Sequence, residues 1–236
     1  MIALQPQHTA GDFLAQNRGG GLFTETVSQR LGAHLSVAAY RLGLAPTVLT
    51  LGNLVLGLAA STAVIALADR WRDLHLAVGL GALVLWHLAY ALDCADGQLA
   101  RVTGRTGPAG KRIDILCDVA IQIALVAAVV AVAAAYTDDL PAWLGAAFAG
   151  AWMVNLVTSV LQQDSSAHSL IASTSPAVRV VKLVRDYGAV VTVLGLTLAF
   201  VPQWTVWLLV AFTVVNGVFL LISIAATARA SLRGQS

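Results

Sequence analysis

Charged residues are scarce in this chain of 236 residues: they make up 11% of it, whereas 58% of the residues are hydrophobic. A soluble domain carries about 25% charged residues, so the composition argues against a soluble protein and indicates a membrane protein. The formal net charge is only +2, which gives no broad electrostatic basis for binding nucleic acid. Cysteine is also rare, with only Cys94 and Cys117. The aspartates around these two thiols suit a hard cation, which thiols do not, and we interpret both cysteines as small apolar helix residues.

The N-terminal region shows no signal peptide. Residues 1–21 are polar and end in three consecutive glycines, which predicts a flexible cytoplasmic tail. Residues 22–43 carry apolar side chains at spacings of three and four, with charged and polar residues between them. This pattern predicts an amphipathic helix that lies in the membrane interface.

Long apolar runs begin at Pro46. A helix that spans a bilayer needs roughly 20 apolar residues, and residues 187–228, which carry no charge, are too long for one span. The sequence VPQW at 201–204 is the natural break in this run. We therefore predict an all-α, polytopic membrane protein, with six transmembrane helices in residues 44–228 and a cytoplasmic tail at 229–236. The predicted spans are 46–68, 74–98, 110–135, 141–162, a fifth that begins just before Tyr187 and a sixth that ends near residue 228.

Basic residues indicate which ends of these spans face the cytoplasm. Of the 14 lysines and arginines, only Arg70 and Arg72 fall on one side of the membrane, and all others fall on the termini and the even-numbered loops. The positive-inside rule therefore places both termini and the loop between the second and third spans in the cytoplasm. We expect an integral protein of a bacterial cytoplasmic membrane, with its active site on the cytoplasmic side.

Four aspartates interrupt the apolar pattern: Asp93, Asp96, Asp114 and Asp118. The first two share a face of the second span, and the last two form a stripe on the third span together with Gly110. The connection between them is short and contains glycine and proline, so the two spans form an antiparallel hairpin. The four carboxylates are therefore expected to converge at one depth.

Neighbouring carboxylates at a membrane repel each other and are poorly solvated, and divalent cations remove both problems. Oxygen ligands favour Mg²⁺ or Mn²⁺, and Ca²⁺ also suits them. Four carboxylates can hold two ions, which is a recurrent way to stabilise charge during displacement at phosphorus. Salt bridges to nearby basic residues are an alternative, but they do not explain two same-face pairs of carboxylates. An ion-coupled transporter is another alternative; it predicts charges or broken helices near the midplane, whereas the last three predicted spans contain no charge.

The complete pattern, D-x2-D-G-x2-A-R-x8-G-x3-D-x3-D, resembles the signature of the CDP-alcohol phosphotransferase (CDP-alcohol phosphatidyltransferase) family. All eight signature positions are present without a gap: Asp93, Asp96, Gly97, Ala100, Arg101, Gly110, Asp114 and Asp118. The six-span plan and the preceding interfacial helix also resemble the family. Residues 44–53, LAPTVLTLGN, resemble the start of its first span, although Thr47 stands where asparagine is common.

The resemblance implies an enzyme of phospholipid biosynthesis that transfers a substituted phosphoryl group from a CDP-linked donor to an alcohol and releases CMP. It implies that Asp93, Asp96 and Asp114 bind metal, and that Asp118 is the general base and also touches a metal. The residues expected to shape the nucleotide pocket are Gly97, Ala100, Arg101 and Gly110, joined by Thr50 and Asn53 from the first span. The resemblance further implies a homodimer.

The lipid substrate can take either role in such an enzyme. CDP-diacylglycerol is the expected donor, because a site at the cytoplasmic interface leaves its tails in the bilayer and its nucleotide in water. The other arrangement uses a soluble CDP-alcohol with diacylglycerol as acceptor, and the signature does not distinguish the two. Arg179, Lys182 and Arg185 lie at i, i+3 and i+6 before the fifth span. They could bind the phosphate of inositol phosphate or glycerol phosphate, or they could anchor a helix end to anionic lipid.

Overall fold

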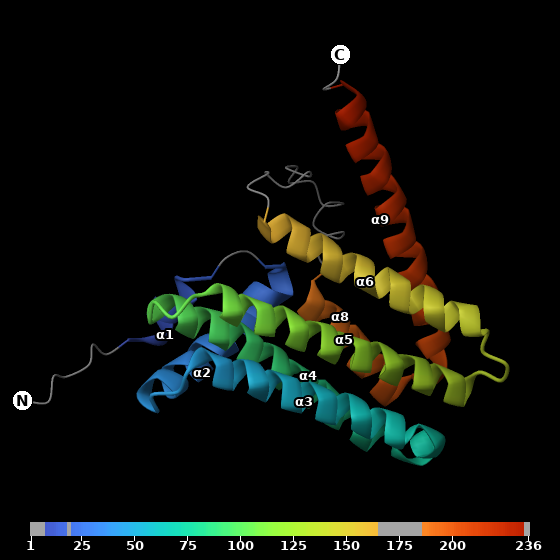
Figure 1. Ribbon diagram of the computed structural model, residues 1–236. Helices are drawn as coiled ribbons and strands as arrows, with labels where there is room; N and C mark the ends of the chain where they lie inside the picture. The colour runs from blue at the N-terminus through green and yellow to red at the C-terminus, as the bar shows by residue number, and fades with distance from the viewer. Residues whose placement is uncertain (1–7, 18–19, 165–185, 234–236) are drawn as a thin grey trace, which may run out of the picture.

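The computed structural model describes residues 8–17, 20–164 and 186–233, and these residues form helices and turns without any strand. Six apolar helices follow one another in alternating directions, and the last of them, α9, projects away from the others towards its C-terminus (Figure 1). This arrangement confirms the predicted all-α, polytopic class. The six helices are α3 (Pro46–Ala66), α4 (Trp71–Val102), α5 (Pro108–Tyr136), α6 (Ala142–Asp164), α8 (Tyr187–Phe200) and α9 (Thr205–Arg233).

Within the described part of the chain, four helical segments are long and apolar enough to cross a membrane: Pro46–Ala66, Arg72–Val102, Pro108–Tyr136 and Pro202–Arg229. The apolar helical segments Ala142–Val154 and Tyr187–Phe200 are shorter. Helix α8, with 14 residues, is about 21 Å long, whereas the hydrocarbon core of a bilayer is about 30 Å thick. Exactly six complete crossings therefore remain a prediction.

Proline and glycine set the ends of the helices that carry the aspartates. Pro46 and Pro108 begin α3 and α5 at the first helical positions, where a missing N–H costs nothing. Gly104 follows α4 with a φ of 66°, a left-handed conformation that favours glycine and ends helices. Two 3-10 turns, η2 (Ala68–Arg70) and η3 (Pro202–Trp204), reverse the chain at the end opposite the α4–α5 turn.

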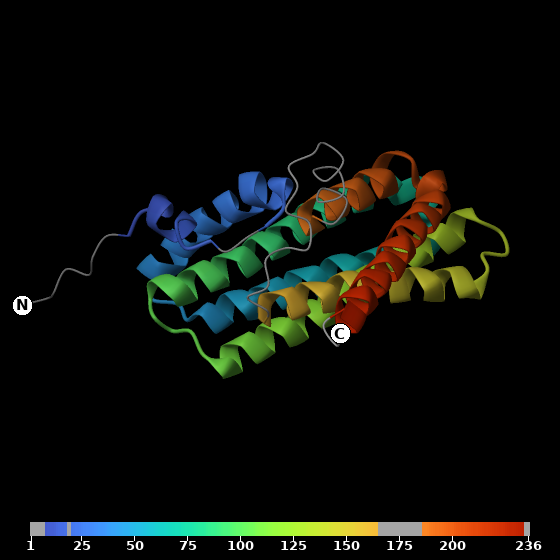
Figure 2. The same cartoon turned by 90° about the horizontal axis from the view of Figure 1, so that it is seen from above.

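Helix α3 holds the two aspartate-bearing helices apart. It packs along both α4 and α5, whereas α4 and α5 themselves meet at only a few positions, as the view in Figure 2 makes visible. Gly57 permits the close approach of α3 to α5, because a Cβ at this position would lie 2.7 Å from Ile121 Cγ2. The predicted hairpin is therefore antiparallel but open, and α6, α8 and α9 cover its other side.

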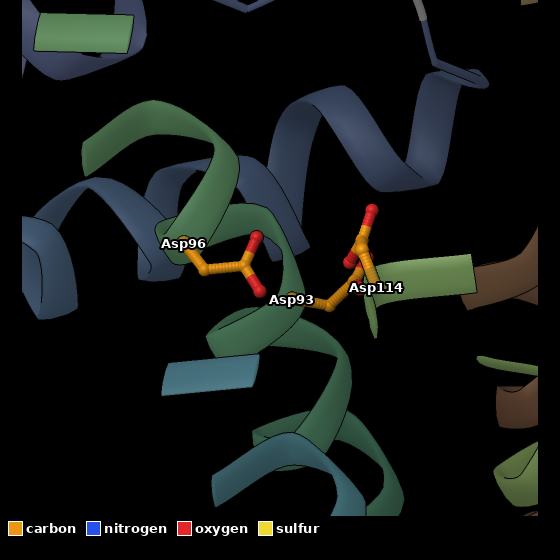
Figure 3. A group of neighbouring side chains, drawn as sticks. All are labelled: Asp93, Asp96 and Asp114. Atoms are coloured by element: carbon orange, nitrogen blue, oxygen red, sulfur yellow. The ribbon is translucent and has the colours of Figure 1, made fainter. Parts of the chain in front are cut away.

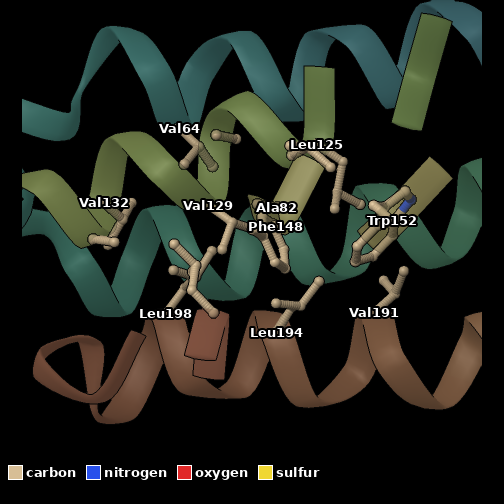
Figure 4. Close-up of a cluster of buried hydrophobic side chains, with 14 of the residues drawn as sticks. Val64, Ala82, Leu125, Val129, Val132, Phe148, Trp152, Val191, Leu194 and Leu198 are labelled. Atoms are coloured by element: carbon tan, nitrogen blue, oxygen red, sulfur yellow. The ribbon is translucent and has the colours of Figure 1, made fainter. Parts of the chain in front are cut away.

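The packed interior lies between these helices (Figure 4) and includes Val64, Leu125, Phe148, Trp152 and Leu194, each at most 3% exposed. Large apolar side chains also cover the outer surface along the helices. Examples are Val55 on α3, Val84 and Leu88 on α4, and Leu221 and Ile222 on α9. A soluble protein does not expose so much contiguous apolar surface, and a lipid-facing exterior accounts for it.

The N-terminal region packs against the C-terminal half of α4. A π-helical turn, η1 (Thr24–Ser28), leads into α2 (Gln29–Arg41), which packs on α4. Gly32 permits this contact, because a Cβ there would lie 2.9 Å from Cys94 Cβ and 3.0 Å from the Ala91 carbonyl oxygen. The amphipathic segment is thus helical, and its place in the membrane interface remains a prediction.

Part of the predicted flexible tail is a docked helix, so that prediction needs correction over residues 8–17. Helix α1 (Ala10–Leu14) begins with a capping box in which Thr9 and Asp12 exchange hydrogen bonds. Phe13 is fully buried and contacts the rings of His8 and Tyr40 edge-on. Burying an aromatic side chain stabilises by a few kcal/mol, which is enough to hold a short helix that composition alone marks as polar.

The predicted topology places the two ends of α5 on opposite sides of the membrane. In intact cells or sealed vesicles, a membrane-impermeant thiol reagent should label Thr137→Cys from outside and Gly107→Cys only after the membrane is opened. The unmodified protein, with Cys94 and Cys117, serves as the background control. Labelling of both introduced cysteines from the same side would contradict the alternating arrangement.

Candidate active site

Three carboxylates converge where α4 and α5 separate. Asp93 and Asp96 project from α4 and Asp114 projects from α5, and one oxygen from each lies within 4.8 Å of the others (Figure 3). Their spacing on α4 is i, i+3, which puts both on one helix face. Of the four aspartates expected to converge, the structure brings these three together, and the Asp118 carboxyl lies beside that of Asp93.

Helix α3 supplies polar partners to two of these carboxylates. The Thr50 hydroxyl donates to Asp96, and the Asn53 amide donates to Asp93 Oδ1 at 3.4 Å. Thr50 and Asn53 are only 4% and 3% exposed, although they lie in an apolar membrane helix. Buried polar groups are costly unless they are hydrogen-bonded, so their position is explained by the carboxylates that they orient.

The aspartates open into a pocket of about 560 Å³ that Asp118, Gly97 and Arg101 also line. The Arg101 guanidinium lies across Gly97, because a Cβ at position 97 would be 3.1 Å from Nη1 and 3.2 Å from Nη2. Glycine thus leaves room for a planar cation beside the carboxylates, where its fork of donors suits a phosphate. Ala100 and Gly110 do not line the pocket, and Gly110 lies next to open space.

The pocket continues beyond the aspartates into an aromatic chamber, which we define by Trp86, Trp152 and Phe212 with Gln122 on its wall. Trp152 and Phe212 stack with ring centroids 4.9 Å apart, and Phe148 contacts both rings edge-on. These four aromatic side chains are each at most 8% exposed. The chamber therefore has a closed, rigid floor.

Asp186 forms the rim of the pocket on the side of the N-terminal segment. It caps α8 by accepting from the Gly188 N–H at 3.1 Å, and it accepts from the N–H groups of Phe23 at 2.7 Å and Thr24 at 3.0 Å. The Thr24 hydroxyl also donates to Asp186 and lies 3.0 Å from the Tyr90 hydroxyl. A Cβ at Gly21 would overlap this carboxylate. One buried side chain thus joins the start of α8, residues 21–24 and, through Thr24, helix α4.

The residues at the carboxylate cluster fit a divalent cation. All candidate donor atoms are carboxylate oxygens, which hard cations prefer. Asp114 Oδ1 is buried and has no hydrogen-bond partner among the described residues, and a buried anionic oxygen without a partner is costly. A cation between Asp93, Asp96 and Asp114 would satisfy this oxygen and offset the repulsion among the three carboxylates.

The sequence pattern did not indicate two residues that line the pocket, Gln122 and Asp186. Gln122 follows Asp118 at i+4 and extends the stripe of Gly110, Asp114 and Asp118 by one turn, which is a signal that could have been used. Asp186 stands directly before an uncharged run, at an N-cap position where aspartate is favoured. Arg179, Lys182 and Arg185, the predicted acceptor site, lie outside the described residues.

Comparison with protein-family models matches residues 43–215 to CDP-alcohol phosphatidyltransferases. The matched range includes α3 to α8 and the first part of α9, and hence all eight signature residues. Comparison with curated proteins gives no match.

Replacing Asp114 should weaken cation binding because it removes one of three convergent oxygen ligands. Even the loss of a residue that only orients a metal ligand costs about 10–100-fold in affinity, so Asp114→Asn should weaken Mn²⁺ binding by at least about tenfold. Titration of the purified protein with Mn²⁺, followed by electron paramagnetic resonance, measures this affinity. Asp73→Asn, an exposed aspartate at the start of α4, is the control for loss of a carboxylate. Equal Mn²⁺ affinity in Asp114→Asn and the unmodified protein would remove Asp114 from the cation site.

Asp186→Ala should loosen the N-terminal segment from the bundle. The change removes the acceptor of three backbone N–H groups, and each unsatisfied buried group costs about 1–3 kcal/mol. Hydrogen exchange should become faster at the amides of Phe23 and Thr24, and the melting temperature should fall. Asp138→Ala, at an exposed turn position, controls for loss of a carboxylate. Unchanged exchange at both amides would show that Asp186 does not hold this segment.

Proposed function

The chain belongs to the CDP-alcohol phosphatidyltransferase family, whose model it matches over residues 43–215, and we propose that it transfers the phosphatidyl group of CDP-diacylglycerol to an alcohol and releases CMP. Membership makes the protein a membrane-bound transferase of phospholipid-type phosphotransfer. The choice of CDP-diacylglycerol as donor, the acceptor and the roles of single residues are the proposal.

The observation that carries the proposal is the convergence of Asp93, Asp96 and Asp114 beside Arg101, at the place where α4 and α5 separate. A pyrophosphate needs positive charge, and a pocket lined by carboxylates provides it only together with divalent cations. We assign these three aspartates to Mg²⁺ or Mn²⁺. A cation held there supplies neutralisation of the pyrophosphate and of the charge that develops on the departing CMP.

Arg101 and the small residues around it bind the donor in this scheme. The guanidinium lies against Gly97, and its fork donates two parallel hydrogen bonds to phosphate oxygens. Thr50 and Asn53 keep Asp96 and Asp93 in place and so act on the donor indirectly. Gly110 borders open space, which leaves room for the nucleotide at the entrance.

Asp118 is the proposed general base. It lines the same pocket, with its carboxyl beside that of Asp93, and it is not one of the three carboxylates assigned to the cation. The acceptor hydroxyl oxygen attacks the β-phosphorus of the donor and its proton passes to Asp118. The bond between the β-phosphorus and the bridging oxygen breaks, and CMP leaves with the electron pair. The charge of the pyrophosphate is thereby divided between product lipid and CMP.

We propose inositol phosphate or glycerol phosphate as acceptor, with Arg179, Lys182 and Arg185 binding its phosphate. Support comes from their position in the chain, since Arg185 directly precedes Asp186, which lines the pocket. A phosphate approaching a pocket with five acidic residues also needs cationic partners. These acceptors dissolve in the cytoplasm, which fits a site on that side of the membrane.

Replacing Asp118 should impair turnover, whereas replacing Arg101 should impair binding of the donor. Asp118→Asn should bind CDP-diacylglycerol almost normally in the presence of Mg²⁺, while CMP release on adding acceptor falls by about 10²–10⁴-fold, as expected for loss of a general base. Arg101→Ala should lose donor affinity, because a charged phosphate contact disappears. Donor binding and CMP release are the two measurements, and Arg105→Ala, an exposed arginine in the adjacent turn, is the control.

Two results would contradict this assignment. If Asp118→Asn also loses donor and metal, Asp118 is a ligand and another group is the base. If the unmodified protein releases no CMP with any alcohol but moves Mg²⁺ across vesicle membranes, the transferase proposal fails and a transporter takes its place.

A further inference from the structure

Gln122 occupies a defined position next to the proposed catalytic residues. It follows Asp118 by four residues on α5, so its side chain lies on the same stripe, about 6 Å further along the helix axis. It lines the same pocket as Asp118, at the aromatic chamber. The chemistry assigned to Asp93, Asp96, Asp114 and Asp118 gives Gln122 no role.

The orientation of the Gln122 amide is fixed by its neighbour. Trp152 Nε1 lies 2.9 Å from Gln122 Oε1, and an indole N–H can only donate. The oxygen of the amide therefore faces Trp152, and the Nε2 group, with its two N–H donors, is the remaining branch. No hydrogen bond of Nε2 is found within residues 8–17, 20–164 and 186–233.

Trp152 itself has little freedom to move. Its ring is 3% exposed, stacks on Phe212 and contacts Phe148 and Tyr187 edge-on. These partners come from α9, α6 and α8 respectively. An amide held by a fixed indole cannot rotate to exchange its oxygen and nitrogen, so the donor branch is set in advance.

The wall of the chamber thus offers two oriented N–H donors one turn beyond the proposed general base. The N–H donors of Gln122 can therefore recognise a ligand oxygen, which accepts through its lone pairs. Two acyl chains do not fit beside a nucleotide in a pocket of about 560 Å³, and they must leave laterally towards the bilayer. The space over the closed aromatic floor is therefore left for the acceptor alcohol, whose hydroxyl must lie against Asp118.

We propose that Gln122, held by Trp152, is a specificity-determining residue that donates a hydrogen bond to a second oxygen of the acceptor alcohol. The acceptor class is then a polyol or polyol phosphate, with one hydroxyl at Asp118 and a neighbouring oxygen at Gln122 Nε2. An alcohol without that oxygen leaves both donors unpaired, which disfavours its binding. This inference rests on the proposed function, because it takes Asp118 as the base.

Equilibrium binding tests the proposal independently of turnover. Radiolabelled inositol phosphate and glycerol phosphate are bound to the full-length protein with Mg²⁺ and CDP present. Gln122→Met keeps the length of the side chain and removes the donors, and affinity for the acceptor that binds should fall about 3- to 10-fold. Gln122→Glu keeps an oxygen for Trp152 and replaces the N–H donors, and it should show a loss at least as large. Affinity for CDP-diacylglycerol should stay within about twofold in both variants.

A deoxy analogue of the acceptor separates recognition from a general structural effect. The unmodified protein should bind the analogue that lacks the second hydroxyl more weakly, and Gln122→Met should show no further loss on the analogue, since both changes remove the same contact. Trp152→Phe should reduce the preference for the polyol in the same direction, whereas Trp143→Phe, an exposed tryptophan on the same helix, should not.

Outcomes that overturn the proposal are distinct from those that overturn the transferase function. Equal acceptor affinity in Gln122→Met, Gln122→Glu and the unmodified protein removes Gln122 from the acceptor site even if CMP is released normally. A selective loss of CDP-diacylglycerol affinity assigns Gln122 to the donor and also overturns the proposal. Failure of the unmodified protein to release CMP with any alcohol refutes the function itself, while the binding comparison still decides the role of Gln122.

Discussion

The mutual repulsion of carboxylates in a poorly solvated place governs the architecture of this membrane bundle. Ionised aspartates cannot be buried together without compensation, yet Asp93, Asp96 and Asp114 bring oxygens within 4.8 Å of one another. The helices around them meet this constraint in two ways. Helix α3 separates α4 from α5 and leaves space for charged ligands, and its own Thr50 and Asn53 donate hydrogen bonds to the carboxylates. The hydrogen bonds to the carboxylates explain why an apolar helix buries two polar residues on one face.

The pocket needs walls that the signature does not contain. Gly20, Gly21, Thr24 and Asp186 line its rim, and α6 and α9 contribute the rigid aromatic floor. The signature helices thus supply charge, while distant segments shape the pocket. Under the proposed function, this division lets one arrangement of aspartates serve different alcohols, because the residues proposed to contact the alcohol lie on other turns and other helices.

The sequence is informative where local chemistry decides the structure. Apolar runs and the prolines at 46 and 108 predict the starts of α3 and α5, and the i, i+3 and i, i+4 spacings of the aspartates predict a shared face. Docking of α1 was missed, because the burial of Phe13 depends on Tyr40, far along the chain. The wide separation of α4 and α5 was also missed, since it results from packing on α3. The role of Asp186 depends on Phe23 and Thr24, and no periodicity connects residues so distant.

Those same hydrogen bonds have a consequence for biosynthesis. Asp186 follows Phe23 by 163 positions and Thr24 by 162. The rim therefore cannot close until the ribosome has reached the start of α8. A nascent chain that ends after α5 already contains every signature aspartate but no complete pocket. The chain order therefore delays completion of the reaction chamber until most of the bundle has been synthesised, whatever the order in which the helices enter the membrane.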